Sequence, residues 1–356
     1  GYTSYPDNVV RAFCKESAAA GIDLFRIFDS LNWEPNLRVA IDAVRESNML
    51  CEVAICYTGD ITDPKRTKYS LDYFVKLATR LEKAGAHILA IKDMAGLCKP
   101  FAAEILVRAL KQEIGIPIHF HTHDASGIQA ASLIKASGAG VDIVDAASGP
   151  MSGMSSQANL DALVEAMRFS PRETGLKPDN LRKLASYWEH VRELYAAFET
   201  GQKAPTSEVY VHEMPGGQYT NLYAQAQSIG ISDRWTEVCQ MYAEVNRLFG
   251  DIVKVTPSSK VVGDMALFMV ANNLTQKDVL DPKRELAFPE SVVDMMMGRL
   301  GQPPGGFPKK LMERVLRGKK PVKGRPGQSM PPADFNATKS KLKKMLGHEP
   351  SLRDVL

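Results

Sequence analysis

Three histidines at alternate positions, His119, His121 and His123, are the residues of this 356-residue chain best suited to chemistry. They end an apolar run that is typical of a buried strand, and side chains two residues apart on a strand point to the same face. Two imidazoles on one face at a strand end form half of a metal site. The sequence therefore predicts His121 and His123 as metal ligands, with His119, deeper in the strand, as a supporting residue.

Lys92 ends the preceding apolar run, within Ala90-Ile-Lys-Asp-Met-Ala-Gly96. A buried ammonium must be paired, neutralised or modified, because an isolated buried charge is costly. Three interpretations remain open from the residue itself: a Schiff-base lysine, an ion pair with Asp93, or a carbamylated lysine that offers an anionic oxygen to a metal. The histidines of the next strand favour the carbamate, since it would complete three ligands of one site. A further ligand, commonly a carboxylate, is not evident in the chain.

The stretch Val255-Thr-Pro-Ser-Ser-Lys260 has two interpretations. Thr followed by Pro is typical of a helix start, with Thr256 as the N-cap residue and Pro257 at the first helical position. A helix N-terminus also offers amide donors to an anionic substrate, and Thr256 and Lys260, four residues apart, are spaced to face one pocket. Spacing alone favours the cap over catalysis.

A Pro-Gly-Gly turn opens another predicted helix, within Glu213-Met-Pro-Gly-Gly-Gln-Tyr219. The simplest interpretation is a turn without a binding role. Gln218 is the side chain there that presents both a donor and an acceptor to a ligand.

The elements that must position these residues alternate between strand and helix. Such alternation predicts parallel strands in an α/β fold. No glycine fingerprint of the dinucleotide or phosphate-loop kind opens any of the helices, and the polar residues cluster just after the strands, as in a (β/α)8 TIM barrel. A closed barrel needs eight strands, so we expect an incomplete barrel whose first three strands precede Gly1. The five predicted strands are 24–28, 51–57, 88–91, 116–120 and 141–145.

Beyond about residue 170 the pattern changes to amphipathic helices without a convincing strand. We therefore predict two regions: residues 1–170, the C-terminal part of a barrel, and residues 171–356, an all-helical region.

Composition limits the function. With 44% apolar and 24% charged residues and a net charge of +3, the chain is ordinary for a soluble globular protein and argues against nucleic-acid or membrane binding. Eight Lys/Arg residues between 309 and 325 are better explained as a solvated surface, since no aromatic residues interleave with them. Five scattered cysteines without a CxxC pair indicate a reducing compartment, either the cytoplasm or, in a eukaryote, the mitochondrial matrix.

Six runs, in the same order, resemble the carboxyltransferase domain of the pyruvate carboxylase family. The related oxaloacetate decarboxylase α subunit shares the barrel motifs, but the run from Glu213 looks more like pyruvate carboxylase. The resemblance covers essentially the whole chain, in Gly1–Asn8, Phe25–Asn32, Ala90–Gly96, His119–Gly127, Glu213–Leu222 and Val255–Asp264.

This resemblance implies a TIM barrel followed by a helical funnel that receives carboxybiotin from a swinging carrier domain. It implies transfer of the carboxyl group to pyruvate, giving oxaloacetate, with a divalent metal (Zn or Mn) at the site. Position by position, it assigns the carbamylated lysine to Lys92, metal ligation to His121 and His123, proton transfer to Thr256, and the substrate and biotin pocket to Tyr2, Gln218, Ser259 and Lys260.

Several features of the family are absent from this sequence. The family's aspartate ligand and substrate-binding arginine belong to strands that would precede Gly1, and neither the ATP-dependent biotin carboxylase part nor a Met-Lys-Met biotin site occurs here. We therefore expect partners in biotin carboxylase and carrier domains of a parent chain, a homo-oligomer, and no activity from this piece alone. The alternatives are a biotin-dependent oxaloacetate decarboxylase, a biotin-free aldolase or acyl-CoA lyase, and a structural or dimerisation fragment.

Overall fold

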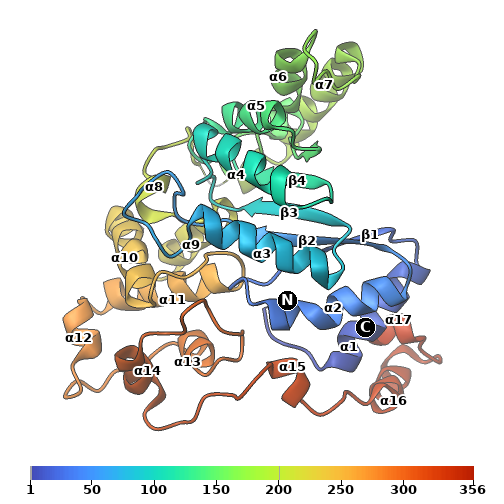
Figure 1. Ribbon diagram of the computed structural model, residues 1–356. Coiled ribbons are helices and arrows are strands. Elements are labelled where there is room, and N and C mark those ends of the chain that lie inside the picture. Colours follow the sequence, from blue (N-terminus) through green and yellow to red (C-terminus); the bar gives the residue numbers. More distant parts are fainter. Residues whose placement is uncertain (1, 200) are drawn as a thin grey trace.

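A five-stranded parallel sheet with strand order β1-β2-β3-β4-β5 forms the first half of the chain in a computed structural model (Figure 1). The structure describes residues 2–199 and 201–356. Strands that follow one another in both sequence and space, each pair joined by a helix, are those of a barrel segment, so the predicted fold class is confirmed. The strands are β1 (Leu24–Ile27), β2 (Leu50–Cys56), β3 (Ile88–Asp93), β4 (Ile118–Thr122) and β5 (Ile143–Val144).

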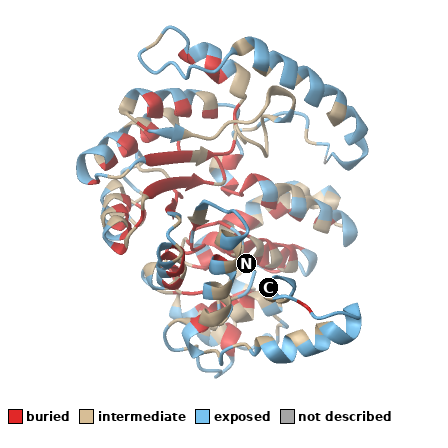
Figure 2. Cartoon of the chain, turned by 90° about the vertical axis from the view of Figure 1, so that its right-hand side faces the viewer, coloured by how far each residue is buried: buried red, intermediate tan, exposed pale blue. Residues whose placement is uncertain are grey.

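The central strands are buried on both faces, which is why they read as near-continuous apolar runs rather than alternating ones. All six residues of β3 are buried, and Figure 2 shows the middle of the sheet as the buried centre of this half of the molecule. The helices around the sheet are α1 (Asp7–Ala19), α2 (Glu34–Glu46), α3 (Leu71–Ala84), α4 (Pro100–Glu113), α5 (Gln129–Ala139) and α6 (Leu160–Met167).

Only helices follow β5 in the described part of the chain, as predicted. Figure 1 shows α8 to α11 gathered at the end of the sheet where the strands finish. The α-helices of this region are α7 (Pro178–Leu194), α8 (Val209–His212), α9 (Gly216–Ser228), α10 (Trp235–Leu248), α11 (Ser258–Ala271), α12 (Gln276–Leu280), α13 (Glu290–Met296), α14 (Lys309–Leu316), α15 (Pro326–Ser329), α16 (Phe335–Leu346) and α17 (Leu352–Val355). None of the helices described is long and apolar enough to cross a membrane.

Two apolar cores hold the described residues together. One lies between the sheet and its helices, and the other lies among α9, α10, α11, α13 and α14. Val253 and Val255, which precede α11, are buried in the sheet core, whereas Leu31, which follows β1, is buried in the helical core. The segments that carry site residues are therefore packed into both cores. The boundary at residue 170 stays a prediction.

A half-buried ion pair joins α1, near the start of the chain, to the segment that leads into α15. The two guanidinium nitrogens of Arg325 lie 2.6 and 2.5 Å from the two carboxylate oxygens of Asp7, at the start of α1. The hydrogen bonds from Arg325 hold the pKa of Asp7 below its ordinary value of 3.8.

We predict that Asp7→Asn lowers the free energy of unfolding by about 1 kcal/mol at pH 7, because it removes a paired, half-buried charge. A carboxyl with a lowered folded-state pKa stabilises the fold above its unfolded pKa, and that contribution disappears as the pH falls below the ordinary value of 3.8. Urea unfolding should therefore show a gap between wild type and variant that is constant from pH 7 to 5 and narrows in acid. A gap independent of pH would contradict this account.

Candidate active site

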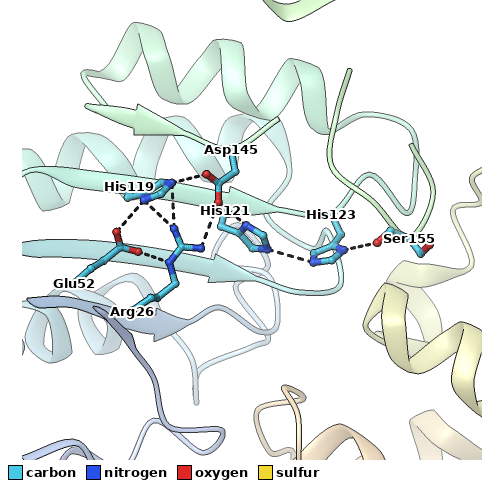
Figure 3. Close-up of polar contacts among 7 residues, drawn as sticks. All are labelled: Arg26, Glu52, His119, His121, His123, Asp145 and Ser155. Atoms are coloured by element: carbon cyan, nitrogen blue, oxygen red, sulfur yellow. Dashed lines mark hydrogen bonds and ion pairs between the residues drawn. The ribbon is translucent and has the colours of Figure 1, made fainter. Parts of the chain in front are cut away.

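His121 and His123 face each other at the end of β4 (Figure 3). Their Nε2 atoms are 3.3 Å apart. The other nitrogen of each ring is occupied: His121 Nδ1 lies 2.7 Å from a carboxylate oxygen of Asp145, and His123 Nδ1 lies 2.6 Å from the carbonyl oxygen of Ser155. With Nδ1 as the donor in both rings, two Nε2 lone pairs are directed toward the same small space.

Burial lowers the pKa of His123 to about 4, more than the carbonyl of Ser155 raises it. This ring is therefore neutral at physiological pH, and neutral imidazole is the form that binds metals.

Lys92 lies beside this pair because the register of β3 and β4 places it opposite His121. The side chain is buried, and its Nζ atom lies 4.7 Å from the centre of the Phe28 ring. The Lys92 ammonium has no hydrogen bond or ion pair among the described residues, whereas the Lys92 carbonyl accepts from the Tyr57 N–H at 2.9 Å. Burial lowers the pKa of Lys92, which favours the neutral amine that reacts with CO2.

The ion pair between Lys92 and Asp93, one of the sequence interpretations, is wrong. Neighbouring residues on a strand point to opposite faces. Asp93 accepts hydrogen bonds instead from the backbone N–H groups of Leu97 and Cys98, at 2.9 Å each, and from the Thr122 hydroxyl at 2.8 Å. Its carboxylate thus stabilises the turn after β3 and leaves Lys92 to the other face.

These residues fit a divalent metal. Two nitrogen ligands at about 2.0–2.1 Å from a tetrahedral ion are separated by about 3.3–3.4 Å, which matches the spacing of His121 Nε2 and His123 Nε2. Both rings have partners that fix their orientation. Within residues 2–199 and 201–356, no group of three His, Cys, Asp or Glu side chains is arranged to hold a metal. Lys92, opposite His121, would be a third ligand only in modified form.

A network of charged side chains lies next to the histidine pair. This network was not predicted from the sequence. Asp145, just after β5, uses one carboxylate oxygen for His121 and the other for His119, whose Nε2 is 2.7 Å away (Figure 3). His119 Nδ1 lies 3.0 Å from Glu52 of β2, and Arg26 of β1 contacts Glu52, His119 and Asp145. One feature of the sequence could have identified Asp145 as part of the site: it is an acidic residue at the end of the predicted strand that follows the histidine strand.

This network charges His119. Burial alone would lower the pKa of His119, but its hydrogen bonds to Asp145 and Glu52 raise it to about 9. Two cations, Arg26 and His119, and two carboxylates, Glu52 and Asp145, therefore meet next to the histidine pair. They fix the orientation of Asp145, and through it the orientation of the His121 ring.

Thr256 is not a helix cap, contrary to the sequence preference. Helix α11 begins at Ser258 with Pro257 in the N-cap position, no side chain caps the helix, and the Thr256–Pro257 peptide bond is cis. The hydroxyl of Ser258, 2.7 Å from the carbonyl oxygens of Val253 and Val255, holds this turn instead. Thr256 is left exposed, with its hydroxyl available for chemistry.

Thr256 lines a cavity that is also lined by residues of β1 in the barrel sheet. This cavity of about 370 Å³ is bounded by residues of α1, β1, α2 and the Thr256 turn. Arg26 and Phe28 line it as well, and Phe28 is the ring against which Lys92 lies. Tyr2 is 65% exposed, and the residues directly after it line the same cavity.

The remaining predicted pocket residues divide into two groups. Gln218 and Ser259 are buried, and the Nε2 atom of Gln218 and the hydroxyl of Ser259 have no hydrogen-bond partner in the described structure. Gln218 packs against α11 one turn beyond Ser259, where a Cβ atom at Gly263 would lie 2.7 Å from its Nε2 atom. Lys260 instead forms an ion pair with Asp264 at 2.7 Å and does not line the cavity with Thr256.

Comparisons with known proteins agree with this arrangement. Residues 14–187 match the family model described as HMGL-like, and residues 209–356 match the one described as "Conserved carboxylase domain". The structure of the carboxyl transferase domain from Rhizobium etli pyruvate carboxylase with pyruvate and biocytin is similar with a TM-score of 0.98 and 57% identity, over 100% of this chain and 60% of that one. The chain belongs to the carboxyltransferase domains of the pyruvate carboxylase family.

Curated members of the pyruvate carboxylase family match the whole chain. Pyruvate carboxylase of Bacillus subtilis is 54% identical over 356 residues, and the human mitochondrial enzyme is 47% identical over 359 residues. The chain covers 31% and 30% of these two relatives, so it spans less than a third of their length.

Proposed function

We propose that this chain is the site of carboxyl transfer from carboxybiotin to pyruvate, giving oxaloacetate. The observation that carries the proposal is the pair of facing Nε2 atoms of His121 and His123, 3.3 Å apart. Beside them lies the buried side chain of Lys92, which has no ion pair among the residues that the structure describes. The likeness to pyruvate carboxylases of known function supports it. In this proposal the three residues hold a divalent metal, with Lys92 as the carbamate, and the metal supplies Lewis acidity near the substrate.

Thr256 moves the proton in this proposal. The reaction breaks the N–CO2 bond of carboxybiotin and a methyl C–H bond of pyruvate, and it forms a C–CO2 bond and a biotin N–H bond. A hydroxyl both accepts and donates a proton, so Thr256 can pass the proton from the methyl carbon to the nitrogen. Its position in a cavity, free of any capping bond, leaves both functions available.

Gln218 and Ser259 provide the polar contacts for biotin. A buried amide or hydroxyl without a partner costs free energy, and a ligand with both a donor and an acceptor, such as the ureido ring of biotin, removes that cost. Lys260 and Tyr2, more exposed, are proposed for the rim of the pocket. The carboxylation of biotin, the biotin carrier, a homo-oligomeric assembly and a location in the cytoplasm or mitochondrial matrix remain predictions about the complete gene product.

The proposal predicts that the complete gene product forms oxaloacetate from pyruvate, bicarbonate and ATP, and that avidin abolishes this activity by sequestering biotin. Oxaloacetate is measured by reduction with malate dehydrogenase and NADH. Biotin-dependent decarboxylation of oxaloacetate without any synthesis would favour the decarboxylase alternative. Avidin-resistant cleavage of an aldol or acyl-CoA substrate would contradict biotin chemistry altogether.

A further inference from the structure

Three charged residues from distant parts of the chain meet in one cluster, which we call the Glu213 clasp: Arg66, Glu213 and Lys254. Arg66 forms an ion pair with the Oε1 atom of Glu213, and the Nζ atom of Lys254 lies 2.9 Å from Oε2. The Glu213 and Lys254 side chains are 7% and 2% exposed. Each carboxylate oxygen therefore has its own cation, and one of these pairs is almost entirely excluded from water.

The clasp attaches the segment before α11 to the barrel. Lys254 also lies 3.1 Å from the hydroxyl of Thr58, in the loop between β2 and α3 that carries Arg66. From the same loop, Lys68 donates to the backbone carbonyls of Gly250 and Asp251, at 2.6 and 2.8 Å. The chain leading to Thr256 is therefore held against the barrel by side chains of a single barrel loop.

Glu213 holds a second segment at the same time. It ends α8 with a positive φ of 54° and leads into the turn that opens α9. Within that turn, the Gly216 N–H donates to the carbonyl of Met94, just after β3. Glu213 precedes Gln218 by five positions, and Lys254 precedes Thr256 by two. One carboxylate thus links the segments that carry Thr256 and Gln218 and joins both to the barrel.

Net stability does not readily explain a buried cluster of this kind. Removing the Glu213 and Lys254 charges from water is costly, and well-packed apolar side chains commonly stabilise a fold as well as a buried ion pair does. An ion pair differs from an apolar contact because separating its two groups leaves an unpaired buried charge, so the two groups have to stay close together. That property is useful where two backbone segments must be held in one relative position.

We infer that Glu213 is a positioning residue that aligns the Thr256 and Gln218 segments with the metal site of the barrel. This inference rests on the carboxyl transfer proposed above. Glu213 touches neither the cavity lined by Thr256 nor the two histidines, so its effect has to pass through Lys254 and the backbone. Small displacements of reacting groups are costly: a shift of about 1 Å can reduce a rate about 100-fold.

The test uses Glu213→Gln and Lys254→Met in the complete gene product, with Glu104→Gln as the matched control. Glu104 also lies between one arginine and one lysine, Arg108 and Lys135, but on the outer surface of the barrel. We expect both clasp variants to lower the kcat of oxaloacetate formation by about 10- to 100-fold. The KM for pyruvate and the metal content should stay within a factor of about two of wild type, because the barrel site is not altered. The control should retain wild-type kcat.

Lys254→Met keeps the inference testable if Glu213→Gln fails to fold, because it leaves Glu213 paired with Arg66 and leaves no unpaired buried cation. Thermal unfolding and metal content measure how much of each preparation is folded, and kcat is calculated for that folded fraction. Wild-type kcat in folded Lys254→Met would overturn the inference, as would a parallel loss of metal and kcat, which indicates general damage. An inactive wild-type gene product would overturn the proposed function itself, so the two failures are distinguishable.

Discussion

Replacing Thr256 by Val in the complete gene product is expected to lower the rate of oxaloacetate formation by about 10²–10⁴-fold, the usual contribution of a proton-transferring group. Valine has the shape of threonine with a methyl group in place of the hydroxyl, so it removes the proton carrier and little else. Thr256 is exposed and caps no helix, so the free energy of unfolding should change by less than about 0.5 kcal/mol. Initial rates and thermal unfolding of the same preparation test both expectations.

Three further substitutions at Thr256 distinguish the effect of losing the hydroxyl from the effect of changing the size of the side chain. Thr256→Ser keeps the hydroxyl and should retain substantial activity, whereas Thr256→Ala and Thr256→Asn lack it and should both fold and be nearly inactive. ATP cleavage by the biotin carboxylase part should survive in every variant, because it does not use this cavity. An active Asn or Val variant would remove Thr256 from the mechanism.

Replacing Lys92 by Ala should remove both the metal and the activity. The wild-type gene product should hold roughly one divalent ion per chain, and the variant should hold much less, because it has lost one of the ligands of the site. Lys92→Glu offers a carboxylate oxygen near the position of the carbamate and should keep part of the metal. Elemental analysis after gel filtration measures the metal, and Lys111→Ala, which removes a surface lysine paired with Asp142, is the control.

The carbamate itself can be tested separately from the metal. Native mass spectrometry of protein prepared in bicarbonate should show one added CO2 in the wild type and none in Lys92→Ala. A metal-loaded wild type with an unmodified Lys92 amine would contradict the carbamate and require another third ligand.

The local pattern of the chain was enough to predict the sheet and one half of the site. Short apolar runs located all five strands to within a few residues, and the period-two spacing of His121 and His123 placed both rings on one face. The Pro-Gly-Gly turn marked the start of α9. These features depend on residues close together in sequence, whose geometry the backbone of a strand or helix already determines.

The tertiary structure alone decided which side chains complete the site. Asp145 orients His121 across 24 residues of sequence, Glu52 meets His119 across 67, and Lys254 reaches Thr58 across 196. No periodicity in the sequence encodes such pairs, because they arise when neighbouring strands and the helical region pack together. The role of Thr256 changed for the same reason. The local Thr-Pro signal favoured a cap, but the buried Ser258 hydroxyl, which also contacts the Ser30 carbonyl across 228 residues, holds the turn, and Thr256 lines the cavity.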